Sequence, residues 1–153
     1  MATPLRSRPA VIPLYRTYVY KTVGDHHLYV DVYLDNNLDK SSQYQLATFF
    51  SGGGWCKNNR TDYPRPLFYE LLAHRYVVCS PGYFSVPETS FPDILTCFKD
   101  FGVWITTKLP EELNKDGIKV DSSSLVATGF SAGGHYALLT VQNFPSEDIN
   151  CFC

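Results

Sequence analysis

Hydrophobic and polar residues alternate in two neighbouring segments near the start of the chain. The segments cover residues 16–23 and 27–34, and both are rich in Tyr and Val. Alternation with this composition is typical of strands that bury one face. Gly24 and Asp25 stand between the segments and predict a tight turn. The pattern therefore predicts an antiparallel β-hairpin.

Beyond residue 43, short apolar runs alternate with segments of helical periodicity. The short runs predict strands, and the periodic segments predict helices with one buried side. Pro110 and the polar run after it are expected to end the second helix. The predicted elements are strands over 44–50, 75–80 and 124–130, and helices over 67–73, 91–109 and 132–142. Strands that alternate with helices predict an α/β fold, with a mostly parallel sheet behind the antiparallel start.

The composition is that of a globular protein. The chain has 153 residues, of which 44% are hydrophobic and 18% are charged, and this is enough for one domain with its own core. No internal repeat indicates a second domain, so we expect a single domain over residues 1–153. Within it, we expect residues 1–14 to be a flexible N-terminus and residues 144–153 to be an irregular tail.

Charge and cysteine content exclude several classes of function. The net charge of -2 and the pI near 6.0 give no electrostatic reason to expect nucleic acid or an anionic membrane as partner. No run approaches the roughly 18 apolar residues that span a bilayer. The five cysteines are odd in number and never spaced as Cys-x-x-Cys, so neither a disulfide framework nor a zinc site is predicted. We expect a cytoplasmic protein with no membrane span, no metal and no cofactor.

The first chemical motif is Gly-Phe-Ser-Ala-Gly at residues 129–133, with Ser131 at its centre. It lies between a predicted strand and a predicted helix, which is the context of a nucleophile elbow. Glycine tolerates the φ values and the close backbone approach that bring the serine Oγ out of the chain. The alternative is a glycine-rich turn that cradles a phosphate.

The second motif is the triple glycine at residues 52–54, between the third predicted strand and the first helix. Serine hydrolases take backbone N–H groups for the oxyanion hole from this position, together with the N–H of the residue after the nucleophile. Here these groups would come from Gly52, Gly53, Gly54 and Ala132. The alternative is an ordinary flexible glycine loop.

With both motifs in place, the chain resembles the hormone-sensitive-lipase-like branch of the α/β-hydrolases, a family of carboxylesterases and lipases. The segments that match are 50–55, 81–93 and 129–135, and the resemblance extends over residues 15–143. It implies that Ser131 is the nucleophile and that Gly52, Gly53, Gly54 and Ala132 are the oxyanion positions. Ser51 departs from the pattern, because the family has histidine there.

The resemblance also implies that this chain is the N-terminal half of an α/β-hydrolase fold, without the C-terminal strands. In the family the catalytic acid and histidine follow the nucleophile in sequence, and we expect this chain to lack both. His135 matches a family position that packs structurally, and no convincing triad can be assembled. The strand over 125–130 would then be an exposed apolar edge, open to self-association or to a complementing chain.

Two functions from different classes remain open from the sequence. The first is a serine ester hydrolase that acts on a small-molecule ester through Ser131. The second is a catalytically inactive binding or regulatory remnant of an esterase, tied to fungal-type secondary metabolism. A nonfunctional fragment of a longer gene is a third interpretation. The sequence does not reveal the substrate.

Overall fold

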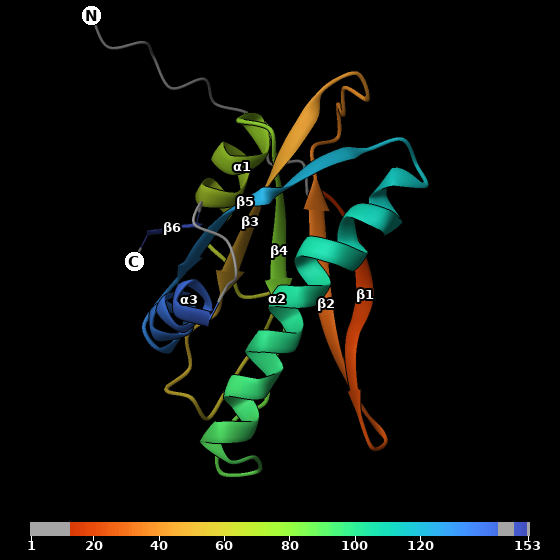
Figure 1. Ribbon diagram of the computed structural model, residues 1–153. Coiled ribbons are helices and arrows are strands. Elements are labelled where there is room, and N and C mark those ends of the chain that lie inside the picture. Colours follow the sequence, from red (N-terminus) through yellow and green to blue (C-terminus); the bar gives the residue numbers. More distant parts are fainter. Residues whose placement is uncertain (1–12, 144–148, 153) are drawn as a thin grey trace, which may run out of the picture.

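The computed structural model describes residues 13–143 and 149–152, which form a mixed six-stranded sheet flanked by helices (Figure 1). The order across the sheet is β1-β2-β4-β3-β5-β6. The strands are β1 (Leu14–Val23), β2 (His26–Leu34), β3 (Gln43–Phe50), β4 (Tyr76–Pro81), β5 (Lys119–Gly129) and β6 (Ile149–Phe152). The helices are α1 (Arg65–Ala73), α2 (Phe91–Asn114) and α3 (Ala132–Asn143).

The strand directions confirm the predicted α/β class. β1 and β2 form the antiparallel hairpin, which turns at Gly24 with a φ of 58°. β2 also pairs antiparallel with β4. The remaining pairs, β3 with β4, β3 with β5 and β5 with β6, are parallel. The antiparallel start followed by a mostly parallel sheet is therefore the arrangement that the sequence predicts.

Helices cover both faces of the sheet, and the alternation along the strands shows which face each helix covers. On β2, Val32 and Leu34 belong to the core that includes the buried side chains of α2 and α3. Tyr33, between them, belongs to the second core with Phe68 and Leu72 of α1. Successive strand residues point to opposite faces, so α1 lies on one face and α2 and α3 on the other.

Helix α2 is longer than the sequence predicts. It passes through Pro110 and ends at Asn114, so the expectation that this proline ends the helix is wrong. Leu109 and Leu113, on either side of the proline, are fully buried. A proline inside a helix removes one backbone hydrogen bond, and we attribute the continuation to the burial of Leu113.

The C-terminal region also differs from the prediction. Residues 149–152, expected to be part of an irregular tail, form β6 and pair in parallel with Leu125–Thr128 of β5. β5 is therefore not the edge of the sheet, contrary to the sequence-based expectation. Residues 144–148 and 153 lie outside the described residues. The same is true of residues 1–12 of the expected N-terminal segment, and Leu14 already belongs to β1.

Candidate active site

Ser131 is an exposed residue at the turn between β5 and α3. Its φ is 56°, in the left-handed region that residues other than glycine rarely adopt. Close backbone contacts require the glycines on either side. A Cβ at Gly129 would lie 2.2 Å from the carbonyl oxygen of Gly133, and a Cβ at Gly133 would lie 2.0 Å from that of Phe50. The turn therefore has the strand, sharp turn and helix of a nucleophile elbow, with a serine at its tip.

The triple-glycine loop lies against this elbow. β3 and β5 are parallel neighbours, so the loops at their carboxyl ends meet at the same edge of the sheet. A Cβ at Gly52 would lie 2.8 Å from the carbonyl oxygen of Phe130 and 3.4 Å from the Cβ of Ser131. Gly53 and Gly54 have φ values of 150° and 60°. The loop needs glycine because of its conformation at 53 and 54 and because of its contact with the elbow at 52.

The backbone N–H groups at these positions are available to a ligand. Among residues 13–143 and 149–152, no backbone or side-chain acceptor is recorded for the N–H of Gly52, Gly53, Gly54 or Ala132. By contrast, the N–H of Gly133 donates to the oxygen of Phe130 at 2.9 Å, and that of Gly134 donates to the oxygen of Ser131 at 2.9 Å. Unpaired donors beside an exposed hydroxyl are what the stabilisation of an oxyanion requires.

A cleft of about 640 Å³ is lined by Ser131 and the three glycines. Aromatic side chains supply much of the remaining wall, and one of them, Phe130, is 73% exposed. The other lining residues are Phe49, Lys57, Asn59, Asp62, Tyr63 and Pro64. A larger cavity of about 720 Å³ lies between the hairpin and the start of α2, and Ser131 does not line it. Chemistry, rather than size, identifies the smaller cleft as the candidate site.

Ser51 holds the base of the glycine loop. The residue is 1% exposed, and its carbonyl oxygen accepts a hydrogen bond of 2.6 Å from the hydroxyl of Tyr83. Its Oγ accepts a bond of 3.3 Å from the N–H of Asn59. Burial raises the pKa of Tyr83, so this phenol remains a donor at neutral pH. Tyr83 lies in the segment 81–93 that carries the family resemblance, but the sequence did not predict that Tyr83 and Asn59 bond to Ser51, because these bonds join separate segments of the chain.

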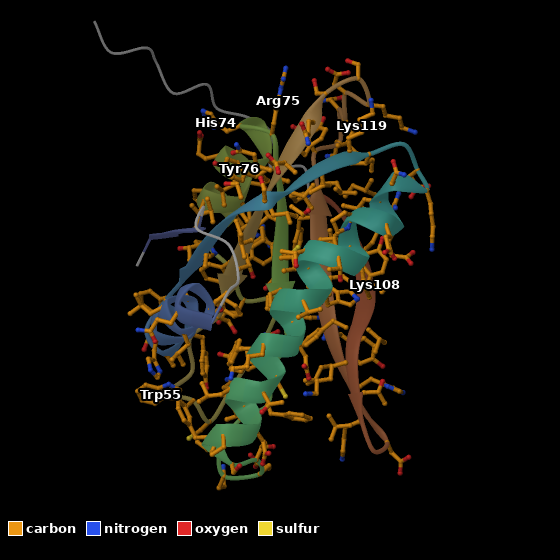
Figure 2. The ribbon with its side chains drawn as sticks, in the orientation of Figure 1. Trp55, His74, Arg75, Tyr76, Lys108 and Lys119 are labelled. Carbon is orange, nitrogen blue, oxygen red and sulfur yellow. The ribbon has the colours of Figure 1, made fainter. Side chains whose placement is uncertain are left out.

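Trp55 joins the end of the glycine loop to α3. Its indole Nε1–H donates to Nδ1 of His135 at 3.2 Å, and its carbonyl oxygen accepts from the N–H of Val86 at 2.9 Å. Figure 2 shows Trp55 beside the lower end of α3. The His135 ring also stacks on Phe91, with a centroid separation of 5.9 Å. His135 therefore makes packing contacts and does not line the cleft.

No histidine of the described residues lines the cleft that contains Ser131. His74 follows α1, where its Nδ1 lies 2.8 Å from the carbonyl oxygen of Glu70. His26 and His27 lie on the hairpin, and His26 lines the larger cavity instead. Within the described ranges, the Ser131 hydroxyl has no hydrogen bond to a histidine or a carboxylate. The described part of the chain thus presents an exposed serine without a histidine bonded to it.

Two further findings concern the described residues alone. They contain no group of three or more His, Cys, Asp or Glu side chains that could hold a metal ion. None of their helices is both long and apolar enough to cross a membrane.

Comparisons with curated proteins show similarity to fungal enzymes. The chain is 33% identical over 125 residues to the non-reducing polyketide synthase stbA of Stachybotrys bisbyi, covering 81% of this chain and 6% of that protein. It is 27% identical over 137 residues to the probable carboxylesterase M8 of a Phoma species, covering 85% of this chain and 43% of that protein. The chain therefore spans less than half the length of the curated relatives it matches here.

Comparison with solved structures gives the same fold. The apo form of esterase 2 from Thermogutta terrifontis superposes with a TM-score of 0.66 and 25% sequence identity, over 87% of this chain and 47% of that one. The family model described as BD-FAE matches residues 30–150. By this match the chain belongs to the BD-FAE family, an esterase-like family of the α/β-hydrolase fold.

Proposed function

We propose that this chain supplies the nucleophile and the oxyanion hole of a serine ester hydrolase. Ser131 would be the nucleophile, and the oxyanion hole would be formed by N–H groups of the loop Gly52, Gly53 and Gly54 together with that of Ala132. The substrate would be a small-molecule ester that enters the aromatic cleft. Membership of an esterase-like family agrees with this assignment.

The contact between the glycine loop and the elbow is the main support. Gly52 lies so close to Phe130 and Ser131 that no side chain fits between them. The loop is therefore held against the elbow at Gly52, and among the described residues no acceptor is recorded for its N–H groups at positions 52–54. Preorganised donors of this kind stabilise the charge that develops on a carbonyl oxygen in acyl transfer.

The reaction would proceed in two steps. The Ser131 Oγ attacks the ester carbonyl carbon while a general base removes its proton, and the carbonyl oxygen becomes an oxyanion bound by the backbone N–H groups. Collapse breaks the ester C–O bond, and the alcohol leaves with the proton from the protonated base. Water, activated by the same base, then attacks the acyl-serine, so that a carboxylic acid leaves and the Ser131 hydroxyl is regenerated.

Among the described residues that line the cleft, none is a histidine, and the one carboxylate, Asp62, has no hydrogen bond to Ser131. We propose that the base and its orienting acid come from sequence outside the described residues or from a second polypeptide. β6 is the strand that follows β5 in the sheet order, so a complementing or self-associating chain would pair along β6. Without a base, hydrolysis should be slow, although oxyanion binding alone leaves about 10³–10⁴-fold catalysis over water.

An organophosphorus probe tests this proposal directly. A fluorophosphonate should label the wild-type chain at Ser131, as located by mass spectrometry of the modified peptide. Ser131→Ala should not be labelled, whereas Ser124→Ala should be labelled like the wild type, because Ser124 lies on β5 and does not line the cleft. Because no described residue that lines the cleft is a histidine, labelling should be slow, and a folded wild-type chain that stays unlabelled after prolonged exposure to excess probe would refute the ester-hydrolase assignment.

The second candidate function is the inactive binding or regulatory remnant. The observation in its favour is the lack of a histidine in the cleft among the described residues. Polyketide synthases among the relatives agree with a role in fungal secondary metabolism. A chain that binds small esters without reacting with the probe would support this function. The cytoplasmic location stays a prediction.

A further inference from the structure

The contact between Trp55 and His135 connects the two halves of the candidate site. Trp55 directly follows the triple glycine, and His135 lies on the first turn of α3, four residues after Ser131. The hydrogen bond between them, 3.2 Å long, is reinforced by an edge-to-face ring contact with centroids 5.9 Å apart. A movement of the glycine loop away from the elbow would break this contact.

The backbone of Trp55 is held in a costly conformation. Its φ is 63°, in the left-handed region, directly after two glycines that also have positive φ values. A bulky residue persists there only where surrounding contacts hold it. Two hydrogen bonds hold Trp55, the indole bond to His135 and the bond from the Val86 N–H to the Trp55 carbonyl oxygen. Loss of the indole bond should therefore loosen the whole loop.

The chemistry of this hydrogen bond requires an acceptor at position 135. An indole N–H can only donate, so the Nδ1 that faces it accepts. A side chain at position 135 that offers no acceptor would therefore break the contact.

We propose that Trp55 and His135 form a clamp that holds the glycine loop against the Ser131 elbow through the hydrogen bond between the indole and the imidazole. His135 is thus a positioning residue, acting through Trp55 on the oxyanion N–H groups. The clamp affects the position of the loop whether or not Ser131 reacts. Its effect on catalysis rests on the proposed function.

Several titratable groups lie on the elements around His135. They are Tyr136 on α3, Cys56 in the glycine loop, Tyr83 after β4, and Glu88 and Asp93 around the start of α2. Among the described residues, no ion pair joins His135 to any of these groups. Tyr136 and Tyr83 have raised pKa values because they are buried, and so they do not change charge where histidine titrates.

Tryptophan fluorescence tests whether the contact forms in solution. The chain has two tryptophans, so in Trp104→Phe the emission comes from Trp55 alone. We expect this emission to shift in Trp104→Phe/His135→Leu, which removes the acceptor of the indole proton. It should be retained in Trp104→Phe/His135→Asn, because an asparagine amide oxygen accepts that proton. Unchanged emission in the leucine variant, or equal shifts in the leucine and asparagine variants, overturns the proposal.

Hydrogen exchange tests whether the contact holds the loop. At pH 7.5, protection of the Cys56, Lys57 and Val86 amides, which donate to the carbonyl oxygens of Gly53 and Trp55, should fall at least tenfold in Trp55→Phe and in His135→Leu. It should be retained in His135→Asn. The double variant Trp55→Phe/His135→Leu should lose no more protection than either single variant, because both remove the same bond. Additive losses, or equal losses in the leucine and asparagine variants, contradict the clamp.

Probe labelling separates this proposal from the proposed function. If Ser131 reacts, Trp55→Phe and His135→Leu should react about 10- to 100-fold more slowly, since small misplacements at an active site have effects of this size. If Ser131 does not react in any variant, the hydrolase assignment fails, and the fluorescence and exchange results still decide on the clamp.

Discussion

Replacement of Gly52 by alanine should slow acyl transfer strongly while leaving the chain folded. The new Cβ would lie 2.8 Å from the carbonyl oxygen of Phe130 and 3.4 Å from the Cβ of Ser131. An ordinary contact requires about 3.4 Å or more, so the loop must retreat from the elbow by about half an ångström. The elbow itself cannot yield easily, since Gly129 and Gly133 are packed against neighbouring backbone.

The expected size of the effect follows from what the displaced groups do. The loss of one oxyanion donor costs about 10²–10³ in rate, and a displacement of about 1 Å can cost about 10². We therefore expect Gly52→Ala to lower the second-order rate of fluorophosphonate labelling by about 10²-fold. Thermal unfolding should change little, because the residue lies on a partly exposed loop outside both hydrophobic cores.

A matched control separates the clash from a general effect of alanine. At Gly82 the added Cβ would meet the Tyr29 carbonyl oxygen at 3.4 Å and the Asn58 Oδ1 at 3.9 Å, both ordinary contact distances, and Gly82 does not line the Ser131 cleft. Gly82→Ala should therefore be labelled at nearly the wild-type rate. If Gly52→Ala is folded and labelled as fast as wild type, the loop does not supply the oxyanion donors, and the reasoning from the contact geometry is wrong.

Three further predictions concern stability. Tyr83→Phe removes the only side-chain donor recorded to the buried Ser51 oxygen among the described residues and should cost about 1–3 kcal/mol in urea unfolding; an unchanged midpoint would contradict the anchoring role. Leu113→Ala should lower the free energy of unfolding by about 2–5 kcal/mol, because the leucine side chain is fully buried. If α2 ended before Leu113, the same replacement should change the free energy of unfolding little. The pKa of Asp39 is lowered to about 2 by hydrogen bonds from Ser41 and Ser42. The stabilisation by this carboxylate is therefore present above pH 3.8 and is lost as the pH falls through about 2. NMR titration of the carboxyl should give this pKa, and Asp39→Asn should abolish that part of the acid dependence of stability.

Local patterns were sufficient to predict most elements of the sheet and its helices. The hairpin around Gly24 follows from two-residue alternation and a turn residue, both of which act within a few positions. The same holds for the elbow at Ser131, where small residues must flank the sharp turn. Continuation of α2 beyond Pro110 could not be predicted in this way, because it depends on the burial of Leu113 in the core under α2 and α3.

The strand β6 shows the same limit at the other end of the chain. Its residues 149–152 have no strong strand signal of their own, and they are ordered by pairing with Leu125–Thr128. Hydrogen bonding to a neighbouring strand depends on the position of that strand in the sheet, which no local pattern encodes. The expectation of an irregular tail failed for this reason.

By itself, the sequence determined the fold class and the positions of the two glycine motifs, since steric limits on glycine and the periodicity of apolar residues act locally. Tertiary structure alone decided that Gly52 contacts the elbow, that Tyr83 anchors Ser51, and that Trp55 meets His135. Tyr83 and Ser51 are 32 positions apart in the chain, and Trp55 and His135 are 80 positions apart. They meet because parallel strands bring their carboxyl ends to one edge of the sheet.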